Sequence, residues 1–139
     1  MVDATSGLLT TLNTGSVDGG APARILPYTT AEAITAGDAC SLDTNGTLQQ
    51  ADSDDTGFDF AYVGVALTDA ASGAVCSVVT GVGVVLNINC DDVGAGVAMM
   101  MGGTAGRLTT ATNAAGAPKT QAVTLENNSA AGLTKCQTL

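Results

Sequence analysis

Residues 78–90, Val-Val-Thr-Gly-Val-Gly-Val-Val-Leu-Asn-Ile-Asn-Cys, decide the fold of this chain. From Val78 to Cys90 every second residue is apolar or Thr. This period of two is typical of a strand that buries one face. We therefore expect the longest strand here, at the centre of a sheet. Gly81 and Gly83 leave room on the other face for a bend or a neighbouring backbone.

Short apolar runs separated by Gly and other turn residues continue on both sides of this strand. Asn45-Gly46 predicts a tight hairpin turn, because both residues tolerate a positive φ. Gly, Ala, Thr and Val dominate the 139 residues and helix formers are scarce, so we expect one all-β domain, a β-barrel or a β-sandwich. The predicted strands are 39–42, 47–50, 62–67, 75–79, 81–89, 98–101, 107–110, 122–125 and 134–138.

The β region contains a repeat-like pattern of glycines and strand segments. Two interpretations stay open: a duplicated β-hairpin unit, or chance similarity in a sequence of low diversity. A duplication predicts halves at about 33–80 and 92–139, joined by a central strand at 81–90. The landmarks recur at separations of 59 (Gly37 and Gly96), 60 (Gly46 and Gly106), 58 (Val65 and Val123) and 59 (Gly73 and Gly132).

Residues 1–30 differ from the β domain at 31–139, because they show neither the strand period nor the helix period. Their Gly, Pro, Thr and Asn content predicts an extended N-terminal arm. The arm has too few apolar residues for a core of its own but too many for a purely solvated tail. We expect its apolar residues to contact another surface; they are Leu8, Leu9, Leu12, Ile25 and Leu26.

The formal net charge is -9, from 13 acidic and 4 basic residues. The resulting field repels phosphate backbones and anionic lipid heads, so we expect neither nucleic acid nor membrane as a partner. The start of the chain shows no signal-peptide pattern, and no stretch has the length and apolarity of a membrane span. These features predict synthesis in a cytoplasm.

Catalysis requires an activated nucleophile or a group that titrates near neutrality. The chain has no His and two Glu, and no Ser in a nucleophile-elbow context. We therefore expect no enzyme and no cofactor. The four cysteines, at 40, 76, 90 and 136, fit neither a zinc pattern nor a redox pair. Buried free thiols are the favoured interpretation, and disulfides formed after release from the cell remain the alternative.

The acidic segment 52–59 places Asp52, Asp54 and Asp59 around a Gly, as at the start of a calcium-binding loop. The pattern is incomplete, because the twelfth position is Val63 instead of Glu. An ordinary solvated turn is favoured, and a cation site is the weaker interpretation.

Met99, Met100 and Met101 are consecutive in a predicted strand. Neighbouring strand residues point to opposite faces, so at least one of the three should point outward unless another surface covers it. A subunit contact is one interpretation. The equally favoured alternative is that Met fills gaps in a core that has few aromatic side chains.

Two elements of this sequence resemble the small capsid decoration, or cement, proteins of tailed phages. The first is Ile34-Thr35-Ala36-Gly37-Asp38, and the second is Tyr62-Val63-Gly64-Val65-Ala66-Leu67 followed by Thr68-Asp69-Ala70-Ala71-Ser72-Gly73. A degenerate return occurs at 122–126 and 131–133, so the resemblance covers about residues 31–139. The cysteines and the N-terminal leader are not part of the family pattern.

The resemblance implies a β-barrel or β-sandwich subunit that forms a homotrimer. It implies binding to the major capsid protein at three-fold and quasi-three-fold positions on the outside of a mature phage head, with stabilisation of the virion by mass action. One alternative is a surface-exposed binding module for a glycan or host receptor, disfavoured because the chain has no Trp platform. Another is a calcium-dependent assembly module that uses the acidic segment.

Overall fold

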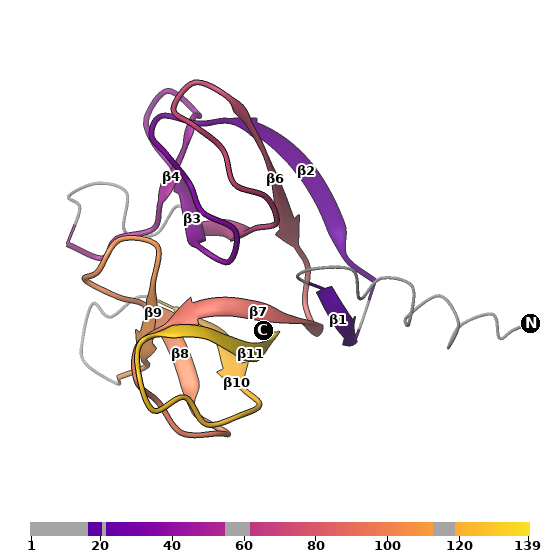
Figure 1. Cartoon of the computed structure of the whole chain (residues 1–139), viewed down its shortest axis with the longest axis vertical. Helices are drawn as coiled ribbons and strands as arrows, with labels where there is room; N and C mark the ends of the chain where they lie inside the picture. The colour runs from indigo at the N-terminus through magenta and orange to yellow at the C-terminus, as the bar shows by residue number, and fades with distance from the viewer. Residues whose placement is uncertain (1–16, 21, 55–61, 113–118) are drawn as a thin grey trace, which may run out of the picture.

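The computed structural model describes residues 17–20, 22–54, 62–112 and 119–139. These residues form eleven strands and no helix, so the expected all-β class is confirmed (Figure 1). No helix that is long and apolar enough to cross a membrane occurs among them. The strands are β1 (Val17–Gly20), β2 (Arg24–Thr29), β3 (Ala39–Leu42), β4 (Leu48–Gln50), β5 (Tyr62–Ala66), β6 (Val75–Thr80), β7 (Val84–Cys90), β8 (Ala98–Met101), β9 (Leu108–Thr110), β10 (Thr120–Thr124) and β11 (Gly132–Thr138).

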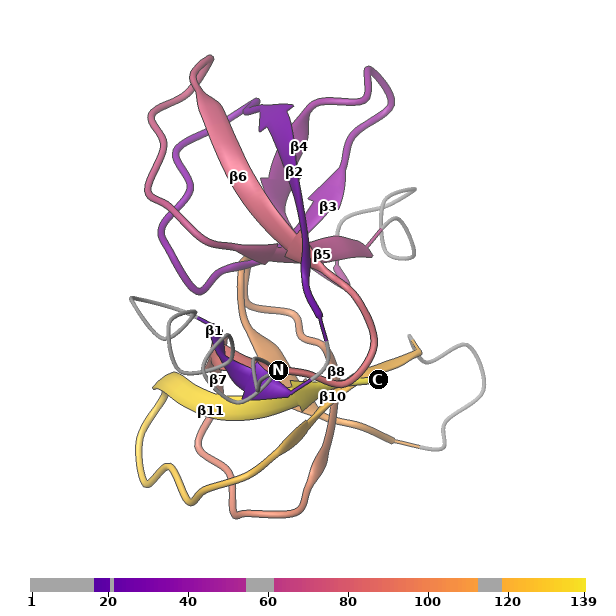
Figure 2. The same ribbon diagram turned by 90° about the vertical axis from the view of Figure 1, so that its right-hand side faces the viewer.

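The strands form two sheets that lie in separate lobes. One sheet has the order β2-β6-β5-β3-β4, and the other has the order β1-β7-β11-β10-β8-β9. Figures 1 and 2 show the first sheet in the upper lobe and the second in the lower lobe, with β1 beside β7. Within both sheets the strand pairs are antiparallel, except for a parallel contact between β7 and β9.

The two sheets repeat one arrangement of five strands, which is the arrangement that a duplication would produce. Strands β2 to β6 correspond to β7 to β11, and the strand order within the two units is the same. Each unit also curls until its two outer strands meet in parallel, at Thr30–Leu48 in the first and at Cys90–Leu108 in the second. Each half is therefore a small, partly open barrel, and the chain contains two of them.

The boundaries of the halves differ from the expected ones. The predicted strand at 81–89 begins only at Val84, because Gly81 and Gly83 have φ values of 135° and 77° and turn the chain after β6. Strand β7 belongs wholly to the second half, where it occupies the place that β2 has in the first. It does not join two halves as a shared central strand.

Strand β2 lies within the segment that the sequence assigned to an N-terminal arm. It pairs with β6 from Arg24–Thr80 to Thr29–Val75, so it is an integral strand of the first half. The sequence did not predict β2 because its side chains, including that of Pro27, are mostly exposed and do not alternate between apolar and polar. Strand β1 also lies in that segment and pairs with β7, so the predicted arm at 1–30 is wrong for β1 and β2, and residues 1–16 lie outside the described residues.

Buried side chains form two clusters. The smaller cluster fills the first barrel, with Ile34, Leu48 and Val78 at its centre. The larger cluster fills the second barrel and extends into the first half, where Val65 and Val79 belong to it. Because the larger cluster includes side chains of both halves, apolar packing joins the two barrels, while the smaller cluster remains separate.

We predict that Val84→Asp destabilises the fold by about 4 kcal/mol or more, because it buries an unpaired charge in the larger cluster. Val82→Asp is the matched control, since Val82 is 73% exposed in the turn that precedes β7. Denaturant unfolding of the two variants measures the difference. A Val84→Asp protein as stable as Val82→Asp would contradict the assignment of Val84 to the core.

Candidate functional site

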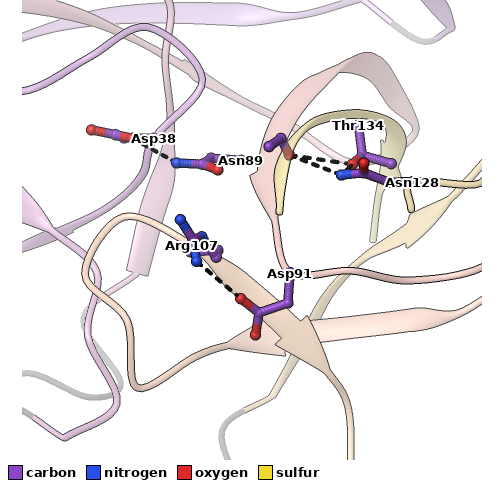
Figure 3. Close-up of polar contacts among 7 residues, drawn as sticks. Asp38, Asn89, Asp91, Arg107, Asn128 and Thr134 are labelled. Atoms are coloured by element: carbon purple, nitrogen blue, oxygen red, sulfur yellow. Dashed lines mark hydrogen bonds and ion pairs between the residues drawn. The ribbon is translucent and has the colours of Figure 1, made fainter. Parts of the chain in front are cut away.

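The junction between the two halves contains a buried carboxylate that accepts hydrogen bonds from both halves. Its centre is Asp38, whose side chain is buried at the start of β3. One carboxylate oxygen accepts hydrogen bonds from the Thr35 backbone N–H (2.9 Å) and the Gln50 side-chain amide (2.8 Å). The other accepts a hydrogen bond of 3.4 Å from the Asn89 side-chain amide, which belongs to the second half (Figure 3).

Backbone contacts surround this carboxylate and join the halves directly. The Asn89 N–H donates to the Gly37 carbonyl (2.8 Å), and the Ala39 N–H donates to the Gly106 carbonyl (2.9 Å). The Gly106 N–H in turn donates to the Ala51 carbonyl (2.9 Å). A Cβ atom at residue 106 would lie 3.0 Å from the Asp38 carboxylate, so the turn between β8 and β9 needs glycine at this point. The site is thus a structural junction.

An ion pair lies close to this junction. Arg107 Nη1 is 3.5 Å from Asp91 Oδ1, and both side chains are partly exposed (Figure 3). Solvent screens such a pair, so its contribution to stability is small.

The acidic segment does not form a metal site within the part of the chain that the structure describes. Asp52 accepts a hydrogen bond from the Asp54 N–H (2.9 Å), which is an ordinary turn contact. No group of three His, Cys, Asp or Glu side chains that could hold a metal occurs among the described residues, and Asp59 lies outside them. The segment instead contacts the second half, because the Ser53 N–H donates to the Gly102 carbonyl (2.9 Å).

All four cysteines are buried free thiols. Burial raises the pKa of Cys40 and of Cys76. Cys90 and Cys136 have their sulfur atoms 3.8 Å apart inside the second barrel, and this contact together with burial raises the pKa of Cys136. The thiols pack as small apolar side chains, as the favoured interpretation expected.

The predicted contact residues lie in two different environments. Met99 and Met101 are fully buried in the second barrel and Met100 is half-buried, so the first two fill the core. Ile25 and Leu26 on β2 are 52% and 37% exposed, although both are large and apolar. Leu8, Leu9 and Leu12 lie outside the described residues.

A small cavity lies between the halves beside the C-terminal end of β11. Its lining includes Tyr62 and Gly64 from the first half and Gln121 and Thr138 from the second. Its volume is about 40 Å³, enough for a water molecule but too small for an organic substrate. Burial raises the pKa of Tyr62, so this phenol remains neutral.

No protein-family model matches the chain, and no curated protein matches it either.

The sequence did not identify the junction as a site. The one available signal was the difference between the two copies, since Gly37-Asp38-Ala39 in the first corresponds to Gly96-Val97-Ala98 in the second. An acidic residue in only one of two corresponding apolar loops indicates that this residue makes a polar contact that the other loop lacks. That contact is the one with Asn89.

We predict that Asp38→Ala destabilises the protein by about 2 kcal/mol, because it removes a buried carboxylate that accepts hydrogen bonds from donors of both halves. Asp92→Ala removes an equal charge from an exposed position and serves as the control. Thermal unfolding of both variants checks this. Equal stability of the two would show that the carboxylate is not needed at the junction.

We further predict that a thiol reagent at about pH 8 modifies none of the four cysteines in the folded protein, because each is buried and at least three have a raised pKa. Unfolding in denaturant should release all four for labelling. Mass spectrometry counts the labels. Rapid labelling of the native chain would contradict the burial of these thiols.

Proposed function

We propose that this chain is a structural decoration (cement) protein, which binds the outside of a mature tailed-phage capsid and stabilises it. The observation that supports the proposal most is the contact between the two sequence elements that resemble this family. The Ile34 N–H donates to the Ala70 carbonyl (2.8 Å), and the Gly37 N–H donates to the Ala66 carbonyl (2.8 Å). Backbone hydrogen bonds thus hold the two elements together as one structural unit, which supports a structural role.

The second copy preserves the same scaffold with different residues. A bridge between Val93 and Asn128 corresponds to the bridge between Ile34 and Ala70. The Gly96 N–H donates to the Thr124 carbonyl (2.7 Å), as Gly37 does to Ala66. Two copies of an architectural unit, with no reaction centre among the described residues, favour a protein that acts by binding.

The proposed partners are the major capsid protein and further copies of this chain, assembled as a homotrimer at three-fold and quasi-three-fold sites. Several weak contacts made at once give a trimer a far stronger attachment than one subunit has. A protein that binds only the expanded lattice stabilises that lattice by mass action. The proposed location is the outer surface of the virion, after synthesis in the host cytoplasm.

Binding to particles tests the proposal. We expect purified chain to co-sediment with expanded phage heads that lack it, and electron microscopy should show added density at three-fold positions. Heads decorated in this way should withstand a higher temperature before they release DNA. Undecorated heads after incubation with a saturating concentration of chain would refute the proposed function.

We also expect a chain without residues 1–16 to fold, because the deletion retains every described strand, and to occupy fewer sites on the head. Circular dichroism checks the fold, and quantitative gel analysis of sedimented heads gives the occupancy. The full-length chain at the same concentration is the control. Full occupancy by the truncated chain would show that the N-terminal segment does not contribute to binding.

A further inference from the structure

We propose that copies of this chain associate head to tail, with the loop Gly96–Ala98 of one chain docked onto Thr29 and Val75 of the next. The inference rests on the self-association in the proposed function and names the two faces that carry it. It follows from the contact between the two halves within one chain, which supplies a template for the contact between chains.

The template is the contact within one chain, in which a loop of the first half packs against two paired residues on neighbouring strands of the second half. The loop is Gly37–Ala39, and the pair is Asn89 and Leu133, register partners on β7 and β11. The Asn89 N–H donates to the Gly37 carbonyl, and the side chain of Leu133 occupies the space that a Cβ of residue 37 would need. Glycine at 37 is therefore what allows this close approach.

Each of these surfaces has a counterpart in the other half. The loop Gly37–Ala39 corresponds to Gly96–Ala98, and both glycines have a positive φ, 95° at Gly37 and 74° at Gly96. The pair Asn89 and Leu133 corresponds to Thr29 and Val75, which are register partners on β2 and β6. The template joins two different surfaces, so it is a heterologous contact and leaves one surface of each kind unused.

Both unused surfaces are open in the single chain. Gly96 and Ala98 are exposed, and the space around a Cβ at residue 96 holds no atom within 4 Å. Thr29 is exposed, and Val75 is 63% exposed although it is apolar. Val75 is thus free to cover Gly96 of a neighbouring chain as Leu133 covers Gly37.

The contact between chains differs from its template in one respect. Val97 stands where the template has Asp38, and Thr29 stands where it has Asn89, so the carboxylate–amide hydrogen bond has no equivalent. The contact between chains is accordingly more apolar and weaker than the permanent junction within a chain. A heterologous contact gives a closed ring where its rotation closes and an open filament where it does not, and the proposed homotrimer requires the ring. A ring of three chains then contains six copies of the unit in sequence.

Two charged substitutions test the faces. We expect the parent chain to be trimeric by native mass spectrometry, and Val75→Asp and Ala98→Arg each to be monomeric. Val82→Asp and Ala130→Arg place the same charges at exposed positions outside both faces and should leave the trimer intact. All four substituted positions are at the surface, so the circular dichroism spectrum should be unchanged in every variant.

Mixing the two monomeric variants identifies the contact as head to tail. Val75→Asp retains an intact loop, and Ala98→Arg retains an intact Thr29–Val75 surface, so an equimolar mixture should form a complex of two chains that cannot close. No complex in the mixture, a monomeric parent chain, or trimers of either variant would overturn the inference.

Particle binding separates this inference from the proposed function. A parent trimer that is disrupted by both substitutions but does not bind phage heads would refute the function and support the faces. A parent chain that decorates heads, while Val75→Asp remains trimeric, would refute the faces and leave the function standing.

Discussion

The buried carboxylate of Asp38 is the interaction on which the arrangement of the two halves depends. It accepts hydrogen bonds from its own half through Thr35 and Gln50, and from the other half through Asn89. Because its counterpart in the second copy is Val97, the two copies cannot exchange places. This one acidic side chain thus makes the contact between the two similar barrels unsymmetrical.

Much of the fold could be predicted from the sequence, because strand alternation and glycine turns are local signals. The period of two after Val84 corresponds to the alternating burial of β7, and the repeated glycines at 37 and 96 and at 46 and 106 all have a positive φ. Strand β2 escaped prediction since its exposed side chains carry no period. The junction could not be predicted because Asp38 and Asn89 are distant in sequence, and only the folded chain brings them together.

The core explains how such a chain packs without large aromatic side chains. Cys, Val, Ala and Thr fill most buried positions, and Met99 and Met101 supply bulk where the second barrel needs it. Small side chains let neighbouring backbones approach closely, and the two barrels share part of one cluster. In contrast to this interior, β2 leaves the apolar side chains of Ile25 and Leu26 exposed at the surface.

Strand β1 has a consequence for how the chain acquires its fold during synthesis. It precedes the whole first half, yet it pairs with β7 of the second half, at Val17–Leu86 and Gly20–Val84. On the ribosome the first barrel can therefore form while β1 still has no strand to join. Only the emergence of β7 gives it a partner, so β1 can join the fold only after the whole first half has been synthesised.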